Sequence, residues 1–309
     1  MKQFKGGYMY NVNDYCRELF GKKVYKIALN AGMTCPNRDG TCGTRGCIFC
    51  STGGSGDFAE DPRLPLDEQI EAAKTRVRDK FHGDQFIAYF QAYTNTYAPP
   101  EHLEKLFFPV IERDDIAALS IATRPDCLSY ETIAILDRLN RIKPVWVELG
   151  LQTIHPCTAE YIRRGYELSV YDEAVKALKS INVHVITHII LGLPGESAED
   201  MKKTAEYVVR TYEKEPCKDR IHGGIKLQLL HVLKGTDLAD DYEKGNFKIL
   251  SLEEYTDILC SILEIIPDDI VIHRLTGDGP KKLLIAPLWS ADKKKVINTI
   301  NKAIRERGL

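Results

Sequence analysis

The sequence predicts an α/β protein built on one parallel sheet, in the form of an open or partial barrel. Short apolar runs rich in β-branched residues alternate with amphipathic segments along most of the 309 residues. That alternation is typical of repeated strand–helix units. No linker rich in Pro, Gly or Ser interrupts it. Six units are too few for a closed eight-stranded barrel, so we predict a partial (β/α)6 barrel with the helices outside.

The predicted strands are short runs of apolar and β-branched residues. They are the run after Lys23 (VYKIAL), Phe86–Tyr93, Ile116–Thr123, Val145–Leu151, Val183–Leu191 and Ile225–Val232, with short additions at Ile270–Leu275 and Leu283–Ala286. The fifth run, VHVITHIIL, is almost entirely β-branched or apolar. Such a composition is typical of a parallel strand that is buried on both faces.

The predicted helices follow from apolar residues at helical spacing and from capping residues. They are Asn13–Phe20, Leu66–Phe81, Glu101–Glu112, Ser129–Arg141, Val170–Ser180, Ser197–Tyr212, Ser251–Ile266 and Lys293–Arg307. Asp67 is a candidate cap for the second helix, and Ser197 with Asp200 and Ser251 with Glu254 match capping boxes. We therefore expect an N-terminal extension at 1–22, a core at 23–266 and a C-terminal extension at 267–309 packed on that core.

Charge and cysteine content limit the class of protein. Lys and Arg number 42 against 44 Asp and Glu, yet residues 1–26 and 281–309 are both basic. Basic ends could contact a polyanion, and they could equally be terminal helices exposed to solvent. No apolar run approaches the roughly 20 residues of a membrane span, and the N-terminus lacks a signal-peptide core. Nine scattered cysteines suit a reducing compartment, so we expect a cytoplasmic protein with no membrane partner.

Four of the cysteines lie within sixteen residues, directly after the first predicted strand. Cys35, Cys42, Cys47 and Cys50 have the spacing C-x6-C-x4-C-x2-C, which could hold one zinc ion. Three of these thiolates could instead hold an iron–sulfur cluster and leave one iron open. A loop after a parallel strand lies at the edge where such sheets bind their ligands. That position favours the cluster.

Several motifs in a fixed order show that the chain resembles the radical S-adenosylmethionine (SAM) enzymes. They include NAGMTCPNRDG, GCIFCSTGGSGDFA, YFQAYTNTYAP, SIATRPDCL, ELGLQTIHPCTAEYIRRGY, THIILGLPGES and HRLTGDGPKKLLIAPLWS. The likeness is greatest to the YhcC/YtqA-type group, which is related to the elongator catalytic subunit. It implies a [4Fe–4S] cluster on Cys35, Cys47 and Cys50. Cys42 is the alternative to Cys35, because C-x4-C-x2-C is close to the superfamily's common C-x3-C-x2-C spacing.

The resemblance also implies the chemistry and the residues around the cofactor. The open iron binds SAM, and an electron from flavodoxin or ferredoxin cleaves it to methionine and a 5′-deoxyadenosyl radical. The implied SAM contacts are Phe49, Tyr93, Thr94, Asn95, Gln152, Arg164 and His188. Gln152 and Arg164 could instead be ordinary rim residues, and His188 a hydrogen-bonded core histidine. Glu148 faces the barrel if Gln152 does. No catalytic residue is assigned.

Kinship with the elongator subunit points to RNA as the substrate. The resemblance implies tRNA, and specifically the carboxymethylaminomethyl side chain of its wobble uridine, converted towards aminomethyl. His273, Arg274, Lys281 and Lys282 could grip the RNA, or could form a structural turn. Two other functions stay open: a radical SAM enzyme acting on a small metabolite or peptide, and a non-catalytic metal-binding or electron-transfer module.

Overall fold

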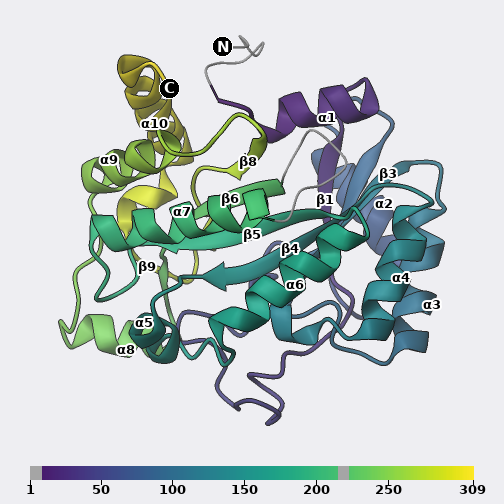
Figure 1. Cartoon of the computed structure of the whole chain (residues 1–309), viewed down its shortest axis with the longest axis horizontal. Coiled ribbons are helices and arrows are strands. Elements are labelled where there is room, and N and C mark those ends of the chain that lie inside the picture. The colour runs from purple at the N-terminus through teal and green to yellow at the C-terminus, as the bar shows by residue number, and fades with distance from the viewer. Residues whose placement is uncertain (1–8, 215–222) are drawn as a thin grey trace.

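A curled sheet of seven parallel strands forms the centre of the protein (Figure 1). The computed structural model describes residues 9–214 and 223–309. The strand order is β1 (Tyr25–Leu29), β2 (Phe86–Phe90), β3 (Ile116–Thr123), β4 (Val145–Gln152), β5 (His184–Leu191), β6 (Gly223–Leu229) and β8 (Ile270–Arg274). Sequential strands thus lie side by side, as repeated strand–helix crossovers require. The predicted partial barrel is confirmed.

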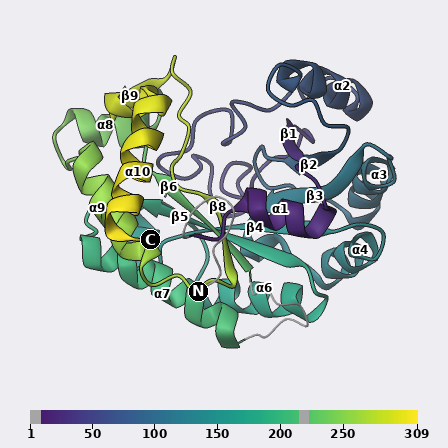
Figure 2. The same cartoon turned by 90° about the horizontal axis from the view of Figure 1, so that it is seen from above.

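Helices cover the outer face of this sheet, as Figure 2 shows from above. They are α2 (Leu66–Val77), α3 (Pro100–Ile111), α4 (Tyr130–Asn140), α6 (Leu168–Ser180), α7 (Ala198–Lys214), α9 (Leu252–Leu263) and α10 (Lys293–Arg307). The short helices α5 (Pro156–Tyr161) and α8 (Asp237–Glu243) follow β4 and β7 (Val232–Leu233) and were not predicted. Within the described ranges, no helix is long and apolar enough to cross a membrane.

The last predicted strands divide between two sheets. Ile270–Arg274 pairs with β6 as the seventh parallel strand. Leu284–Ala286, strand β9, pairs instead with β7 in a separate antiparallel ribbon. The sixth predicted strand, 225–232, is therefore interrupted: β6 ends at Leu229, and Val232 belongs to the ribbon. Periodicity could not reveal this change, because both segments are apolar.

Local capping chemistry decides where several helices begin. Ser251 and Glu254 form the predicted capping box at the start of α9. Ser197 and Asp200 bond each other's backbone N–H before α7, at 3.2 and 3.0 Å. The prediction for Asp67 is wrong, since α2 starts after Pro65 without a side-chain cap. The Asp67 carboxylate instead accepts a 2.6 Å bond from Arg113.

Helix α1 (Val12–Phe20) closes one end of the half-barrel. The Tyr15 ring lies 5.7 Å from the Trp146 ring and 4.8 Å from the His184 ring, measured between centroids. Both partners lie at the start of their strands, β4 and β5. Nearby, Asn11 forms a bridge with Ile272 at the free edge of β8. The amino end of the barrel is therefore filled with rings, and the carboxyl end is left for a site.

The capping box of α9 gives a test of the fold. Ser251→Ala removes the acceptor for the Glu254 N–H, so we expect the free energy of unfolding to fall by about 1 kcal/mol. Ser251→Thr keeps the hydroxyl acceptor and should fall by less than half as much. Urea unfolding followed by circular dichroism measures both. Equal losses in the two variants would show that the cap does not stabilise α9.

Candidate functional site

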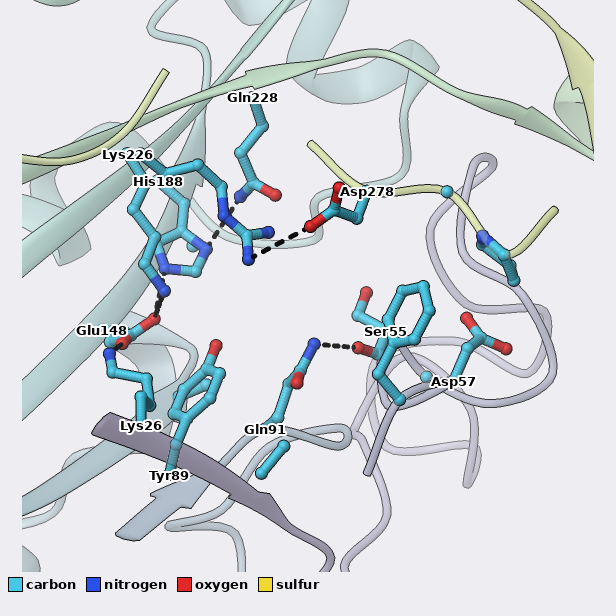
Figure 3. A pocket seen from close by; sticks show the side chains of 18 of the residues that line it. Lys26, Ser55, Asp57, Tyr89, Gln91, Glu148, His188, Lys226, Gln228 and Asp278 are labelled. Atoms are coloured by element: carbon cyan, nitrogen blue, oxygen red, sulfur yellow. Dashed lines mark hydrogen bonds and ion pairs between the residues drawn. The ribbon is translucent and has the colours of Figure 1, made fainter. Parts of the chain in front are cut away.

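A cavity of about 1340 Å³ opens at the carboxyl end of the strands and runs into the half-barrel. The loop between β1 and α2, which carries the clustered cysteines, forms one wall. Strands β1 to β6 form the interior wall, and the segment after β8 forms a third side. Figure 3 shows polar side chains from these elements pointing into the same space. This is the position that parallel α/β folds use for ligands.

Three of the four clustered cysteines line the cavity: Cys35, Cys47 and Cys50. Cys42 is exposed and is not part of the cavity wall. Among the described residues, no three His, Cys, Asp or Glu side chains converge as they would on a single metal ion. A [4Fe–4S] cluster binds each thiolate through a different iron, so its ligands stand farther apart than those of zinc. The donor set fits a cluster on three thiolates.

Cationic and amide donors surround these thiols. Burial raises the pKa of Cys47 to about 11, and the positive charge of Arg124 opposes that rise. Burial also raises the pKa of Cys50, against the charge and hydrogen bond of Arg38. The Asn37 side-chain N–H donates to the Cys47 sulfur at 3.6 Å. Such neighbours stabilise the thiolate form that a metal requires and tune a cluster's potential.

Glycines let the cysteine loop pack closely against the end of β2. A Cβ on Gly54 would lie 2.3 Å from the Tyr93 ring, and one on Gly56 would lie 2.4 Å from the Cβ of Ala92. The Tyr93 N–H donates to the Gly54 carbonyl at 2.8 Å, and the Thr94 N–H donates to the Thr34 carbonyl at 3.2 Å. The residues after β2 therefore hold the loop in place.

Six of the seven residues predicted to contact SAM line the cavity: Phe49, Tyr93, Thr94, Gln152, Arg164 and His188. Asn95 lies elsewhere and is fully buried. Its amide donates to the carbonyl oxygens of Phe90 and Ala122, at 3.0 and 2.9 Å. That side chain joins the ends of β2 and β3.

Gln152 has an unusual backbone conformation and a buried side-chain oxygen without a hydrogen bond among the described residues. It follows a register shift between β4 and β5 and has a φ of 69°. Bulges of this kind redirect a side chain at a strand end. Its buried Oε1 has no hydrogen-bond partner among the described residues. Since buried polar atoms are nearly always bonded, this oxygen fits a donor supplied by a bound molecule.

Arg164 is largely occupied by the backbone. Its guanidinium donates to the Tyr166 carbonyl at 3.0 and 3.1 Å and to the Thr153 carbonyl at 2.6 Å. The Tyr166 ring lies 4.6 Å from its guanidinium carbon. These contacts hold the segment after β4 in place at the edge of the cavity.

Deep in the barrel, the buried Glu148 carboxylate gathers side chains from four other strands. Lys26 from β1 donates to Oε1 at 2.7 Å, and Ser120 from β3 donates to the same oxygen at 2.6 Å. Lys226 from β6 and His188 from β5 both bond Oε2, the histidine at 2.7 Å. Figure 3 shows Glu148 between the two lysines.

The charges in this network follow from its contacts. Burial alone would raise the pKa of Glu148, but Lys226 and Lys26 hold it well below its usual range. Burial and the charge of Lys226 lower the pKa of His188 to about 4. A neutral His188 that donates from Nε2 to Glu148 accepts at Nδ1 from the Gln228 amide, 3.0 Å away. The carboxylate is thus ionised and the imidazole neutral near pH 7.

Sequence reasoning missed Lys26 and Lys226, although a lysine inside an apolar strand (YKIAL, IKLQL) was a usable signal.

The residues of β8 that were predicted to contact RNA lie in different surroundings. His273 Nε2 lies 3.0 Å from His184 Nε2, inside the ring cluster at the amino end of the barrel. His273 still borders the cavity, as do Arg274, Lys281 and Lys282.

Comparison with models of protein families identifies the superfamily of this chain. The model of the Radical SAM superfamily matches residues 39–208, and that of the Radical_SAM C-terminal domain matches residues 223–306. The chain belongs to the radical SAM superfamily. Members of this superfamily use a [4Fe–4S] cluster and SAM, and the three thiols in the cavity wall fit that cluster.

Individual relatives support the narrower group. YtqA of Bacillus subtilis is 45% identical over 97% of this chain and 90% of its own length. YhcC of Escherichia coli K12 is 33% identical over 94% and 90%. A tRNA uridine(34) acetyltransferase of Methanocaldococcus jannaschii is 27% identical over 54% of this chain, but over only 29% of its own length. The solved archaeal Elp3 of Methanocaldococcus infernus shares the fold, with a TM-score of 0.67 at 19% identity over 93% of this chain and 63% of that one.

The close packing of the cysteine loop can be tested with two glycines of the same loop. Gly56→Ala places a methyl group 2.4 Å from the Cβ of Ala92, so the loop must shift. We expect the iron content after anaerobic reconstitution to fall by at least half. In Gly43→Ala the new Cβ would lie 3.5 Å from its nearest neighbour, an ordinary contact. That variant should keep wild-type iron content, and equal losses in both would contradict the packing argument.

Proposed function

We propose that this radical SAM enzyme modifies tRNA at the wobble uridine, acting on a carboxymethylaminomethyl side chain. One observation carries the proposal: the charge of the cavity wall. Twelve Lys and Arg side chains line it against four Asp and Glu, although the whole chain has a net charge of −2. A site so enriched in cations suits a polyanion. The relative named for tRNA uridine 34 supports the same substrate.

The cationic residues divide into a rim and an interior. Lys23 and Lys80 are exposed beside the amino ends of β1 and β2, and Lys281, Lys282 and Lys293 are exposed in the segments after β8. Exposed lysines of this kind suit the phosphates of an RNA backbone, which position a nucleic acid without reading its sequence. The interior is then free to receive one nucleotide that is turned out of the anticodon loop, as enzymes acting on bases require.

The roles of the cofactor residues are part of the proposal. Cys35, Cys47 and Cys50 hold the cluster, and Phe49, Tyr93, Thr94, Gln152, Arg164 and His188 surround SAM. When bound, the cluster and SAM supply a 5′-deoxyadenosyl radical that removes a hydrogen atom from the substrate. The protein's own residues orient the two molecules, while Gln152 Oε1 accepts a hydrogen bond and the ring cluster at the amino end excludes water. A flavodoxin or ferredoxin supplies the electron.

The cluster ligands can be tested one thiol at a time. Cys35→Ala, Cys47→Ala and Cys50→Ala should each lose most of the iron and sulfide after anaerobic reconstitution, because a three-thiolate site has no spare ligand. Cys42→Ala is the matched control and should retain both, since Cys42 is exposed and outside the cavity wall. Loss of the cluster in Cys42→Ala together with its retention in Cys35→Ala would reverse the assignment.

The substrate is tested with the reconstituted wild-type protein, SAM and a reductant. Adding tRNA that carries carboxymethylaminomethyluridine should raise 5′-deoxyadenosine formation at least tenfold, and mass spectrometry of the digested tRNA should show that this nucleoside is consumed. An unmodified transcript of the same tRNA is the control. If neither tRNA changes 5′-deoxyadenosine formation, tRNA is not the substrate. A small metabolite or peptide that does so would then take its place.

A further inference from the structure

The floor of the cavity holds more positive than negative charge. Lys26 and Lys226 share the single carboxylate of Glu148. Arg274, which is paired in register with Lys226 across β6 and β8, adds a third cation 4.0 Å from Asp278. Asp278 already accepts a 2.8 Å bond from the Lys293 ammonium. From floor to rim, four cations therefore face two carboxylates: Lys226 is buried, Lys26 and Arg274 are partly exposed, and Lys293 is an exposed rim residue. His188, which bonds Glu148, is neutral.

Lys226 and Glu148 are the buried charges of this set, and a buried charge is unfavourable unless other groups compensate for it. The side chain of Lys226 is 6% exposed and that of Glu148 is 0% exposed. Burial, together with the positive charges of Lys26 and Arg274, lowers the pKa of Lys226 to about 7 despite the attraction of Glu148. Glu148 alone therefore does not supply enough negative charge to stabilise the ammonium form of Lys226.

The cations remain open to the cavity. Lys226 and Lys26 both lie against the Tyr89 ring, with nitrogen-to-centroid distances of 4.7 and 4.6 Å. Lys26, Lys226, Gln228 and Arg274 all line the cavity wall. An ammonium has three N–H donors, and the bond to Glu148 uses one of those on Lys226. Figure 3 shows Lys226 directed at Glu148 and Gln228 at His188, both beside the open space above Tyr89.

We propose that Lys226 and Arg274, between β6 and β8, form a subsite for a carboxylate group of the substrate. An arginine and a lysine side by side give several charge-assisted N–H donors, which is the arrangement that carboxylates and phosphates bind. Both residues line the cavity, and the side chain of Lys226 is only 6% exposed. A group on the end of a base's side chain therefore suits this subsite better than a backbone phosphate. The inference rests on the proposed function, and the group it assigns to the subsite is the terminal carboxylate of carboxymethylaminomethyluridine.

The test compares two anticodon stem–loop oligonucleotides that differ in one group. One carries carboxymethylaminomethyluridine, and the other carries the same nucleoside with its carboxylate converted to the amide. In fluorescence anisotropy at fixed salt, the reconstituted wild-type protein should bind the acid at least tenfold more tightly than the amide. Lys226→Met and Arg274→Met should each weaken binding of the acid about tenfold, and binding of the amide less than twofold. Lys302→Met removes an exposed lysine outside the cavity wall and should change neither.

A second variant separates the subsite from the general charge of the protein. Glu148→Gln removes the carboxylate that raises the pKa of Lys226, so binding of the acid should weaken as the pH rises from 6 to 8 more steeply than in the wild type. Lys226→Met still leaves Glu148 bonded to Lys26, Ser120 and His188, and its melting temperature should stay near that of the wild type. If Lys226→Met and Arg274→Met discriminate between acid and amide as the wild type does, the subsite is ruled out.

Failure of the proposed function gives a different result. If the wild-type protein binds neither oligonucleotide, RNA is not the substrate, and the subsite is tested with N-methylglycine and acetate. A rise in the melting temperature with either compound in the wild type but not in Lys226→Met would keep the carboxylate subsite and assign it to a small acid. The absence of any rise that depends on Lys226 would overturn the subsite as well.

Discussion

The buried carboxylate of Glu148 explains why the sheet must curl. Lys26 lies on β1 and Glu148 on β4, three strand spacings apart in the sheet. In a flat sheet the two backbones would be about 14 Å apart and both side chains would point straight out of the sheet. In the curled sheet the side chains point toward each other, and the Lys26 ammonium lies 2.7 Å from Glu148 Oε1. Lys226 reaches the same carboxylate from β6 on the other side. A charged core of this kind is satisfied only when the sheet closes around it, so the network and the half-barrel depend on each other.

The two ends of the half-barrel are built for different purposes. At the amino end, the rings of Tyr15, Trp146, His184 and His273 contact one another and fill the space. At the carboxyl end, the cysteine loop approaches β2 so closely that two of its glycines leave no room for a Cβ. Between them lie the charged residues that a purely structural core would not need, since apolar side chains of similar volume are commonly at least as stable. Their presence is easier to explain by a ligand than by stability.

The sequence predicted the strands, most helices and the three cavity cysteines because those features are local. Apolar periodicity, capping residues and cysteine spacing are set within a few positions of each other. The directions of the Asn95 and Arg164 side chains depend instead on carbonyl groups that folding brings close to them. Asn95 turns into the protein to bond Phe90 and Ala122, and Arg164 bonds the carbonyl groups around Tyr166. The convergence of Lys26 and Lys226 on Glu148 depends on the curl of the whole sheet, which no local pattern contains.

The curl of the sheet also brings basic residues from the two ends of the chain to the same cavity. Counted along the sequence, the positive charge lies at the two ends, as if the ends were separate arms for a polyanion. In the folded protein Lys26 lies inside the barrel, and Lys281, Lys282 and Lys293 line the same cavity from the opposite side. The bridge between Asn11 and Ile272 joins the residue before α1 to β8, the last strand of the parallel sheet. Part of the positive charge of each end, on Lys23 and Lys26 and on Lys281, Lys282 and Lys293, therefore lines one cavity. An anionic substrate would meet exposed lysines at its edge and the buried Lys226 at its floor.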